Sequence, residues 1–144
     1  MNLKEIRHRY LKTLSGGQRQ RAYVAMTIAQ DTEYILLDEP LNNLDMKHSV
    51  QIMKTLRQLA KSLNKTIVVV IHDINFASCY SDDIIALKDG EMVKASTKDE
   101  VIQENTLKTL YDMDVKIEEI RGQRICVYFD EETADYELSI LQSV

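Results

Sequence analysis

Residues 34–40 read YILLDEP, an apolar run that ends at two acids and a proline. Such a run is typical of a strand in a parallel sheet that is buried on both faces. The proline, which has no N–H, ends the hydrogen bonding between strands. Residues 66–71, TIVVVI, form a second apolar run, which ends at His72. The segment between them has the apolar spacing of one helix over residues 45–63, with Asp45 as its N-cap. Strand, helix and strand in this order predict a parallel βαβ unit within an α/β fold.

Shorter elements are expected on both sides of this unit. Residues 2–12 have the spacing of the end of a helix. Residues 15–18, SGGQ, fit a capping box with Ser15 as N-cap and Gln18 three places on, followed by a helix with small residues on one face. Beyond the second strand, the pattern predicts a helix over 74–80, a strand over 84–87, a hairpin turn at 88–91 into residues 92–94, two short helices within 98–112, an antiparallel pair at 115–120 and 124–129, and an acidic end over 130–144 that is frayed or a short helix.

Composition bounds the class of protein. With 144 residues, 44% of them apolar and 28% charged, the chain has the usage of one globular domain and is too apolar to be disordered. Its net charge of −5 argues against a dedicated binder of nucleic acid or anionic membranes. The longest apolar run, residues 67–71, is far shorter than a membrane span, and we expect no secretory signal. The two cysteines form no Cys-x-x-Cys pair, so reduced thiols are expected rather than a disulfide or a zinc site.

The SGGQ segment, residues 15–18, has two possible interpretations, an anion-binding helix start or a helix cap alone. A capped helix N-terminus offers unpaired backbone N–H groups and a positive dipole end, and two glycines let a phosphate approach closely. The Ser15 hydroxyl would add a donor. The plainer reading is a well-made helix cap and nothing more.

Polar side chains follow both apolar runs. A carboxylate at the carboxyl end of a parallel strand lies where α/β sheets bind ligands. Asp38 suits Mg²⁺ held partly through water, and Glu39 suits a group that orients or deprotonates an attacking water. His72 could hydrogen-bond a phosphate and hold that water in line. The alternatives are a solvated acidic turn and a structural histidine; His8 and His48 are expected to be surface residues.

Taken together, these motifs resemble the nucleotide-binding subunit of ABC transporters. LSGGQ at 14–18 matches the signature motif, ILLDEP at 35–40 the Walker B motif with its catalytic glutamate, Leu44-Asp45 the D-loop, and His72-Asp73 the switch histidine. The resemblance runs from about residue 11 to residue 94. Residues 22–26, 40–48 and 72–75 are similar to ATPases of ferric-siderophore importers, although LNN at 41–43 departs from the common Thr-Ser-x of the family.

The resemblance implies a fold and a set of site residues. The fold is a P-loop NTPase-like parallel sheet with flanking helices, incomplete, plus a small antiparallel C-terminal strand pair. Two subunits of the family pair head to tail around two ATP molecules. The implied roles are catalysis for Glu39 and His72, contact with the partner's ATP for Ser15, Gly16, Gly17 and Gln18, a link across the seam for Asp45, and Mg²⁺ binding, partly through water, for Asp38.

The phosphate-binding P-loop of the family is missing from these residues. That loop needs the pattern Gly-x-x-x-x-Gly-Lys-Ser/Thr, and none of the four glycines begins it. We therefore expect the C-terminal part of an ABC ATPase domain, either an excised piece or a truncated reading frame, with negligible ATPase activity by itself. Its expected divisions are the end of the helical subdomain at 1–30, the catalytic core at 31–95 and a C-terminal extension at 96–144.

The implied function is ATP-driven uptake of an iron complex such as a ferric siderophore. The expected partners are a second nucleotide-binding subunit, integral membrane permease subunits and, indirectly, a substrate-binding protein, with no nucleic acid, at the cytoplasmic face of the cell membrane. ATP and Mg²⁺ are the expected cofactors. Two alternatives are an ABC-type ATPase of DNA repair or the ribosome, and an inert fragment that only dimerises.

Overall fold

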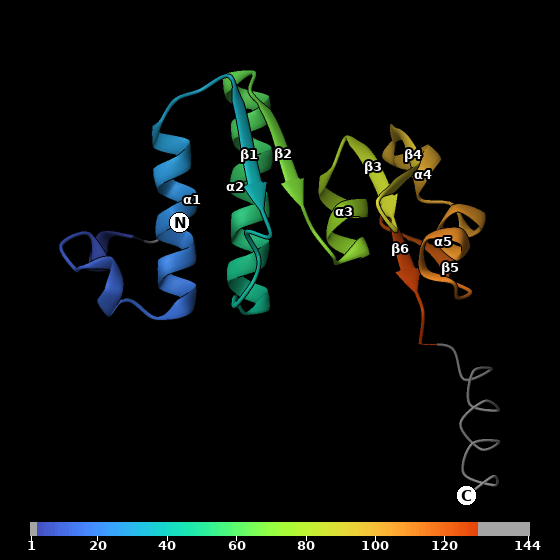
Figure 1. Cartoon of the computed structure of the whole chain (residues 1–144), viewed down its shortest axis with the longest axis horizontal. Helices are drawn as coiled ribbons and strands as arrows, with labels where there is room; N and C mark the ends of the chain where they lie inside the picture. Colours follow the sequence, from blue (N-terminus) through green and yellow to red (C-terminus); the bar gives the residue numbers. More distant parts are fainter. Residues whose placement is uncertain (1–2, 130–144) are drawn as a thin grey trace, which may run out of the picture. The chain divides into compact units, whose positions relative to one another are not determined.

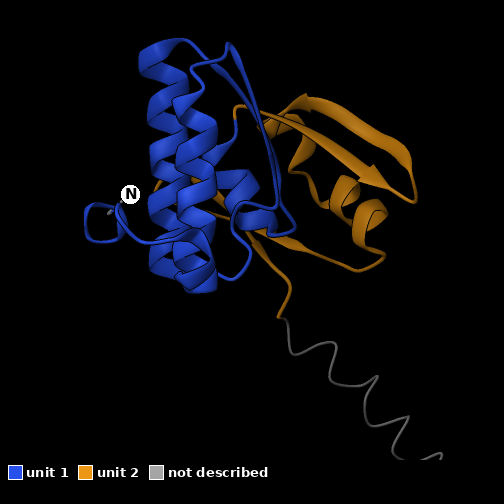
Figure 2. Cartoon of the chain, turned by 60° about the vertical axis from the view of Figure 1, so that its left-hand side comes forward, with its two compact units in different colours: residues 1–81 blue, residues 82–144 orange. Residues whose placement is uncertain are grey.

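The computed structural model describes residues 3–129 of the chain. The chain divides into two compact units, residues 1–81 and 82–144, each with buried apolar side chains of its own (Figure 2). The acidic end predicted over 130–144 lies outside the described residues.

The first unit is built on the predicted βαβ motif (Figure 1). Strands β1 and β2 pair in parallel, with Tyr34 opposite Thr66 and Asp38 opposite Val70. Helix α2 connects them, and the order strand, helix, strand is confirmed. The elements of this unit are η1 (Lys4–Ile6), η2 (Leu11–Thr13), α1 (Gly16–Ala29), β1 (Tyr34–Asp38), α2 (Met46–Leu63), β2 (Thr66–Val70) and α3 (Ile74–Tyr80).

The start of the chain differs from the prediction. Residues 2–12 were expected to end one helix, but the structure has two separate 3₁₀ turns, η1 and η2. Neither turn has a side-chain hydrogen bond at its N-cap. Tyr10, between the two turns, has an extended backbone with φ −68° and ψ 138°, so no continuous helix can run through residues 2–12.

The hydrophobic core of this unit lies on one face of the β1–β2 sheet. Alternate residues of β1 point inward, so Ile35 is 1% exposed while its neighbour Leu36 is 71% exposed. The buried members of the core come from α1, β1 and α2, and they are Val24, Ile35, Leu37, Ile52, Met53 and Leu56.

The prediction that both strands are buried on their two faces is therefore wrong for the described residues. The outward residues Tyr34, Leu36, Val68 and Val70 are all about half exposed or more. The reason is geometric, since successive strand residues alternate between faces and the core lies on only one of them.

The second unit consists of two hairpins and two short helices. Strands β3 (Asp83–Lys88) and β4 (Glu91–Thr97) are antiparallel, and so are β5 (Lys116–Ile120) and β6 (Gln123–Val127), which confirms the predicted C-terminal pair. Both hairpins turn through two residues of positive φ, Asp89-Gly90 and Arg121-Gly122, as two-residue turns of this hand require. Helices α4 (Lys98–Val101) and α5 (Glu104–Tyr111) lie between the hairpins in the sequence.

Candidate active site

The carboxyl ends of β1 and β2 bring Glu39 and His72 into contact. Glu39 follows β1 directly, and His72 lies two residues beyond β2. Because the strands are parallel and in register, their ends meet at one edge of the sheet. There His72 Nε2 makes a hydrogen bond to Glu39 Oε1. Two residues far apart in the sequence thus form one acid–histidine pair.

The backbone at Glu39 is held in an uncommon conformation. Its φ is +46°, in the left-handed region that non-glycine residues seldom occupy and that is concentrated at functional sites. Its N–H donates to the carbonyl of Val70 at 3.2 Å, and its carbonyl accepts from the N–H of Asn42 at 3.2 Å. The buried ring of Pro40 follows. The chain therefore leaves the sheet in a fixed turn, which directs the Glu39 side chain toward His72.

The carboxylate of Glu39 is also bound by Asn42. The Asn42 side-chain amide donates to Oε2, the oxygen that His72 does not contact. The hydrogen bond from His72 and, next, that from Asn42 hold the pKa of Glu39 below its ordinary value. Glu39 is consequently ionised at neutral pH. Since an ionised carboxylate only accepts, His72 Nε2 carries the hydrogen of their bond.

A pocket of about 270 Å³ opens beside this pair. Glu39, His72 and Asp73 supply its titratable groups, and Leu41, Leu44 and Phe76 are among its apolar walls. The Asp73 carboxylate is engaged as the N-cap of α3, where it accepts from the N–H groups of Asn75 and Phe76 at 2.8 and 3.0 Å. Glu39 and His72 are thus the groups of this pocket suited to act on a water or a phosphate.

Asp38 occupies a different position from Glu39. It is the last residue of β1 and is exposed, with Tyr34 and Leu36 on the outward face of the strand. Within residues 3–129, no three His, Cys, Asp or Glu side chains gather as a metal cage would require. A single exposed carboxylate fits Mg²⁺, which keeps several waters and phosphate oxygens among its ligands, and does not fit a metal held wholly by protein.

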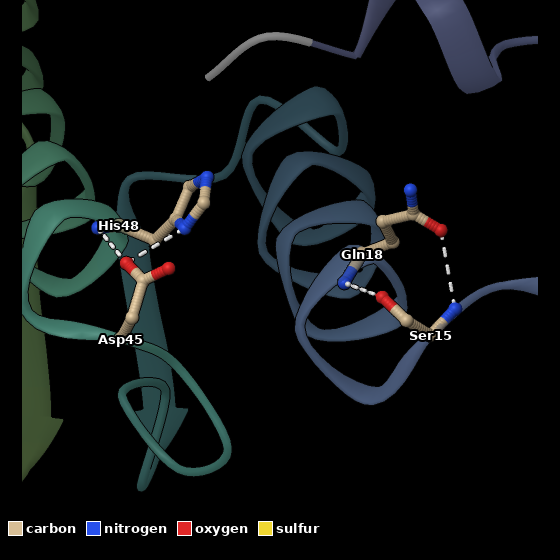
Figure 3. A network of polar contacts seen from close by, with 4 residues as sticks. All are labelled: Ser15, Gln18, Asp45 and His48. Atoms are coloured by element: carbon tan, nitrogen blue, oxygen red, sulfur yellow. Dashed lines mark hydrogen bonds and ion pairs between the residues drawn. The ribbon is translucent and has the colours of Figure 1, made fainter.

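The SGGQ segment forms the predicted capping box at the start of α1 (Figure 3). Ser15 Oγ accepts from the Gln18 N–H at 3.3 Å, and Gln18 Oε1 accepts from the Ser15 N–H at 3.1 Å. The first intrahelical bond joins the Arg19 N–H to the Ser15 carbonyl at 2.9 Å. The N–H groups of Gly16 and Gly17 precede it and have no intrahelical acceptor. These two groups, at the positive end of the helix dipole, can bind an anion.

The start of α1 lies against the loop that follows β1. A Cβ atom on Gly17 would stand 3.2 Å from Leu44 Cδ2 and 3.3 Å from the carbonyl oxygen of Asn43. Further along α1, the Gln20 side-chain amide donates to the Glu39 carbonyl at 3.4 Å. The helix that begins with SGGQ therefore contacts the loop that carries Glu39 at two points.

Asp45 is the N-cap of α2, as predicted. Its Oδ1 accepts from the His48 backbone N–H at 2.9 Å and lies 2.8 Å from His48 Nδ1 (Figure 3). These contacts, the backbone one first, hold the pKa of Asp45 below its ordinary value. Of the predicted site residues, Glu39 and His72 are in contact, whereas Asp45 is bonded to His48 instead.

Two residues near the site were missed in the sequence. The sequence marks Asn42 only as a departure from the family pattern, yet its side-chain amide donates to Glu39. The sequence predicts a surface position for His48 and no contact, yet its ring lies against the carboxylate of the Asp45 cap. The spacing of three residues in both pairs, which brings side chains together in a turn or at a helix start, is the signal that could have found them.

Comparison with known proteins identifies the relatives of this chain. A family model described as ABC transporter matches residues 1–42. The petrobactin import ATP-binding protein YclP of Bacillus subtilis is 61% identical over 129 residues, which cover 90% of this chain and 51% of that protein. The iron(3+)-hydroxamate import ATP-binding protein FhuC of the same organism is 40% identical over 130 residues, 89% of this chain and 48% of that protein. The chain is a partial ABC ATPase domain.

Solved structures agree with this identification. A metal-chelate type ABC transporter in an inward-facing conformation matches with a TM-score of 0.77 and 26% identity, over 89% of this chain and 53% of the solved chain. A dimeric ATP-binding cassette with ADP and phosphate bound matches with a TM-score of 0.57 and 42% identity, over 60% and 37% of the two chains. The ABC ATPase chain thus spans about half the length of the curated relatives it matches.

These matches test the predicted fold and family. The α/β fold and the ABC ATPase resemblance predicted from the motif order are confirmed. Within residues 3–129, no helix combines the length and the apolar composition needed to cross a bilayer.

Proposed function

We propose that this chain is the part of an ATP-binding subunit that carries the hydrolytic residues of an ABC importer for an iron complex, such as a ferric siderophore. The contact between Glu39 and His72 at the ends of adjacent parallel strands carries the proposal. The names of the relatives, which include petrobactin and iron(3+)-hydroxamate import proteins, support an importer over an ATPase of DNA repair or the ribosome.

Glu39 is the proposed acceptor for the attacking water. In the reaction, the water oxygen bonds to the γ-phosphorus of ATP and the bond from that phosphorus to the β–γ bridging oxygen breaks, giving ADP and phosphate. The carboxylate of Glu39, ionised at neutral pH, accepts a hydrogen bond from the water and then its proton, which passes on to solvent. Because little covalent chemistry falls to the protein in phosphoryl transfer, orienting the water is the main task of this residue.

His72 is proposed to hold Glu39 and to contact the γ-phosphate. Its Nε2–H is committed to Glu39 Oε1, which fixes the orientation of the carboxylate. The ring is largely exposed, with 76% of the side chain accessible, so its other edge can reach a ligand. His72 thereby links the presence of the phosphate to the orientation of the water acceptor.

The capped start of α1 is proposed to bind the γ-phosphate of an ATP held by a second subunit. The two glycine N–H groups point out of the helix end, and the Ser15 hydroxyl can donate because only its oxygen is used in the cap. Asp45 would lie beside the seam between the subunits. The dimeric state of the related ATP-binding cassette supports a pair of subunits, and the family resemblance implies that they pair head to tail.

Asp38 is the residue proposed to hold Mg²⁺, in part through water. When bound, Mg²⁺ neutralises charge on the phosphate oxygens of ATP. The exposed carboxylate at the strand end can accept hydrogen bonds from water ligands of the ion.

The remaining assignments complete the proposal. Permease subunits in the membrane, and indirectly a substrate-binding protein, are the partners, at the cytoplasmic face of the cell membrane. Residues 1–30 belong to the helical subdomain, 31–95 to the catalytic core and 96–144 to a C-terminal extension. Hydrolysis by residues 1–144 alone is expected to be negligible, because no glycine in them begins a P-loop pattern.

The test is Glu39→Gln in the complete ATP-binding subunit with its permease. The amide keeps the size of the side chain but cannot accept a proton, so we expect ATP binding to persist while steady-state hydrolysis falls by about 100-fold or more. Glu33→Gln, the same change at the residue before β1, is the matched control and should hydrolyse ATP normally. Normal hydrolysis by Glu39→Gln would reject the role of Glu39.

A further inference from the structure

The carboxylate of Glu39 is held at both of its oxygens. His72 Nε2 contacts Oε1, and the Asn42 side-chain amide donates to Oε2. The terminal torsion of a glutamate is broad, so a carboxylate with one donor can still rotate about it. A second donor on the opposite oxygen removes that freedom. Each oxygen accepts more than one hydrogen bond, so a water can still bind to the fixed carboxylate.

The position of Asn42 is set by hydrogen-bonded turns and by the packing of its neighbours against the core. Its backbone N–H donates to the Glu39 carbonyl at 3.2 Å, and the Leu44 N–H donates to the Leu41 carbonyl at 3.2 Å. The side chains of Leu41 and Leu44 pack against the hydrophobic core of the first unit. The donor is therefore carried by two consecutive turns anchored in the core, which is the support that a precisely oriented group requires.

The chemistry of the amide suits this position. The NH₂ group of asparagine only donates, so it binds the ionised carboxylate and cannot take a proton from the attacking water. Asn42 also stands where the common family pattern, Thr-Ser-x, has a hydroxyl residue. A hydroxyl can donate as well, but it rotates and can also accept, so it holds the carboxylate less strictly.

We propose that Asn42 is a positioning residue for ATP hydrolysis, which fixes the carboxylate of Glu39 in the orientation that His72 alone would leave free. The inference rests on the proposed function of Glu39. Asn42 contacts neither nucleotide nor water in this role and acts only through Glu39.

Three substitutions in the complete subunit separate this role from a structural one. Asn42→Asp replaces the donor by a second acceptor of nearly the same shape, Asn42→Leu removes the donor, and Asn42→Ser keeps a hydroxyl donor. We expect kcat to fall about 10- to 100-fold for the first two, the size of a hydrogen bond to a charged group, with KM for ATP within about twofold of the wild type. Asn42→Ser should stay within about fivefold in kcat.

The matched control is Asn105→Asp, the same chemical change in the first turn of α5, where a negative charge is tolerated. Its kcat and KM should equal those of the wild type. Equal losses in the Asp, Leu and Ser variants of Asn42 would indicate a structural role and overturn the proposal. A raised KM with unchanged kcat would overturn it as well, because it would place Asn42 in nucleotide binding.

A combined variant ties the effect to Glu39. In the Glu39→Gln background, adding Asn42→Asp should lower the residual hydrolysis no further, since the group that Asn42 positions is already disabled. A further loss of tenfold would show that Asn42 acts elsewhere. If Glu39→Gln itself hydrolyses ATP normally, the proposed function fails, whereas a disabled Glu39→Gln beside a fully active Asn42→Asp rejects only the role of Asn42.

Discussion

The carbonyl oxygen of Asn43 lies 3.3 Å from the point at which a Cβ atom on Gly17 would stand. Leu44 Cδ2 lies 3.2 Å from the same point. A larger residue at Gly17 would therefore crowd this loop, a packing reason for glycine that is separate from any approach of a phosphate. Gly17 thus packs the start of α1 against the loop between Glu39 and Asp45 of the same chain.

Substitution of the two glycines by alanine should have different effects on stability. At Gly16 an added methyl meets only Asn43 Cβ at 3.6 Å, an ordinary contact, so Gly16→Ala should be neutral or stabilise by up to about 1 kcal/mol through helix propensity. At Gly17 the methyl crowds a backbone carbonyl, so Gly17→Ala should destabilise by about 1 kcal/mol. Urea unfolding of the two variants measures the difference. Equal midpoints would contradict the close packing seen at Gly17.

The local elements could be predicted because their signals are local. The capping box at Ser15 and Gln18, the N-cap at Asp45 and the helix at Ile74–Tyr80 each depend on side chains a few residues apart. The 3₁₀ turns near the start could not be predicted from the spacing of Leu3, Ile6 and Tyr10, because apolar periodicity does not report the extended backbone at Tyr10.

The cap of α2 is expected to matter for stability on its own account. Asp45→Ala removes the acceptor for the His48 N–H and should lower the unfolding temperature of the subunit. Asp45→Asn and Asp45→Ser retain a capping oxygen and should restore most of this stability. Thermal unfolding distinguishes the three variants. If Asn and Ser are as unstable as Ala, the cap is not what Asp45 contributes.

The ion pair of Asp31 and Lys65 predicts a dependence of stability on pH. Lys65 Nζ lies 2.8 Å from Asp31 Oδ1, and this hydrogen bond, with the charge of Lys65, holds the pKa of Asp31 below its ordinary value. A lowered folded pKa means that the contribution is present above the ordinary value of 3.8 and is lost as pH falls through the folded value. The advantage of the wild type over Lys65→Met should therefore shrink below about pH 4.

The measurement is the urea midpoint of both proteins at neutral pH and near pH 3. Lys65 also donates to the Thr32 carbonyl at 2.8 Å, and the loss of that bond should lower the stability of Lys65→Met by the same amount at every pH. Lys54→Met, an exposed lysine of α2, is the control and should show no change in the difference with pH. A constant advantage of the wild type at both pH values would exclude the pair as its source.

The candidate site was predictable to the extent that topology determines it. Parallel strands with polar residues at their carboxyl ends had to bring Glu39 and His72 to one edge, and they are in contact there. The hydrogen bond from Asn42 to Glu39 depends on the left-handed backbone of Glu39, and no residue type in that loop predicts this conformation. The exposed outward face of β1 was missed because an apolar run alone does not show how many faces are covered.

The central claim is that Glu39 and His72 act as one hydrolytic unit, and kcat for ATP in a double-mutant cycle tests it most directly. Glu39→Gln and His72→Ala should each lower kcat by about 100-fold in the complete subunit, with ATP binding retained. Because removing either member disables the pair, kcat of the double variant should lie within about threefold of kcat of the less active single variant. Losses that multiply in the double variant, or normal kcat in His72→Ala, would contradict the claim.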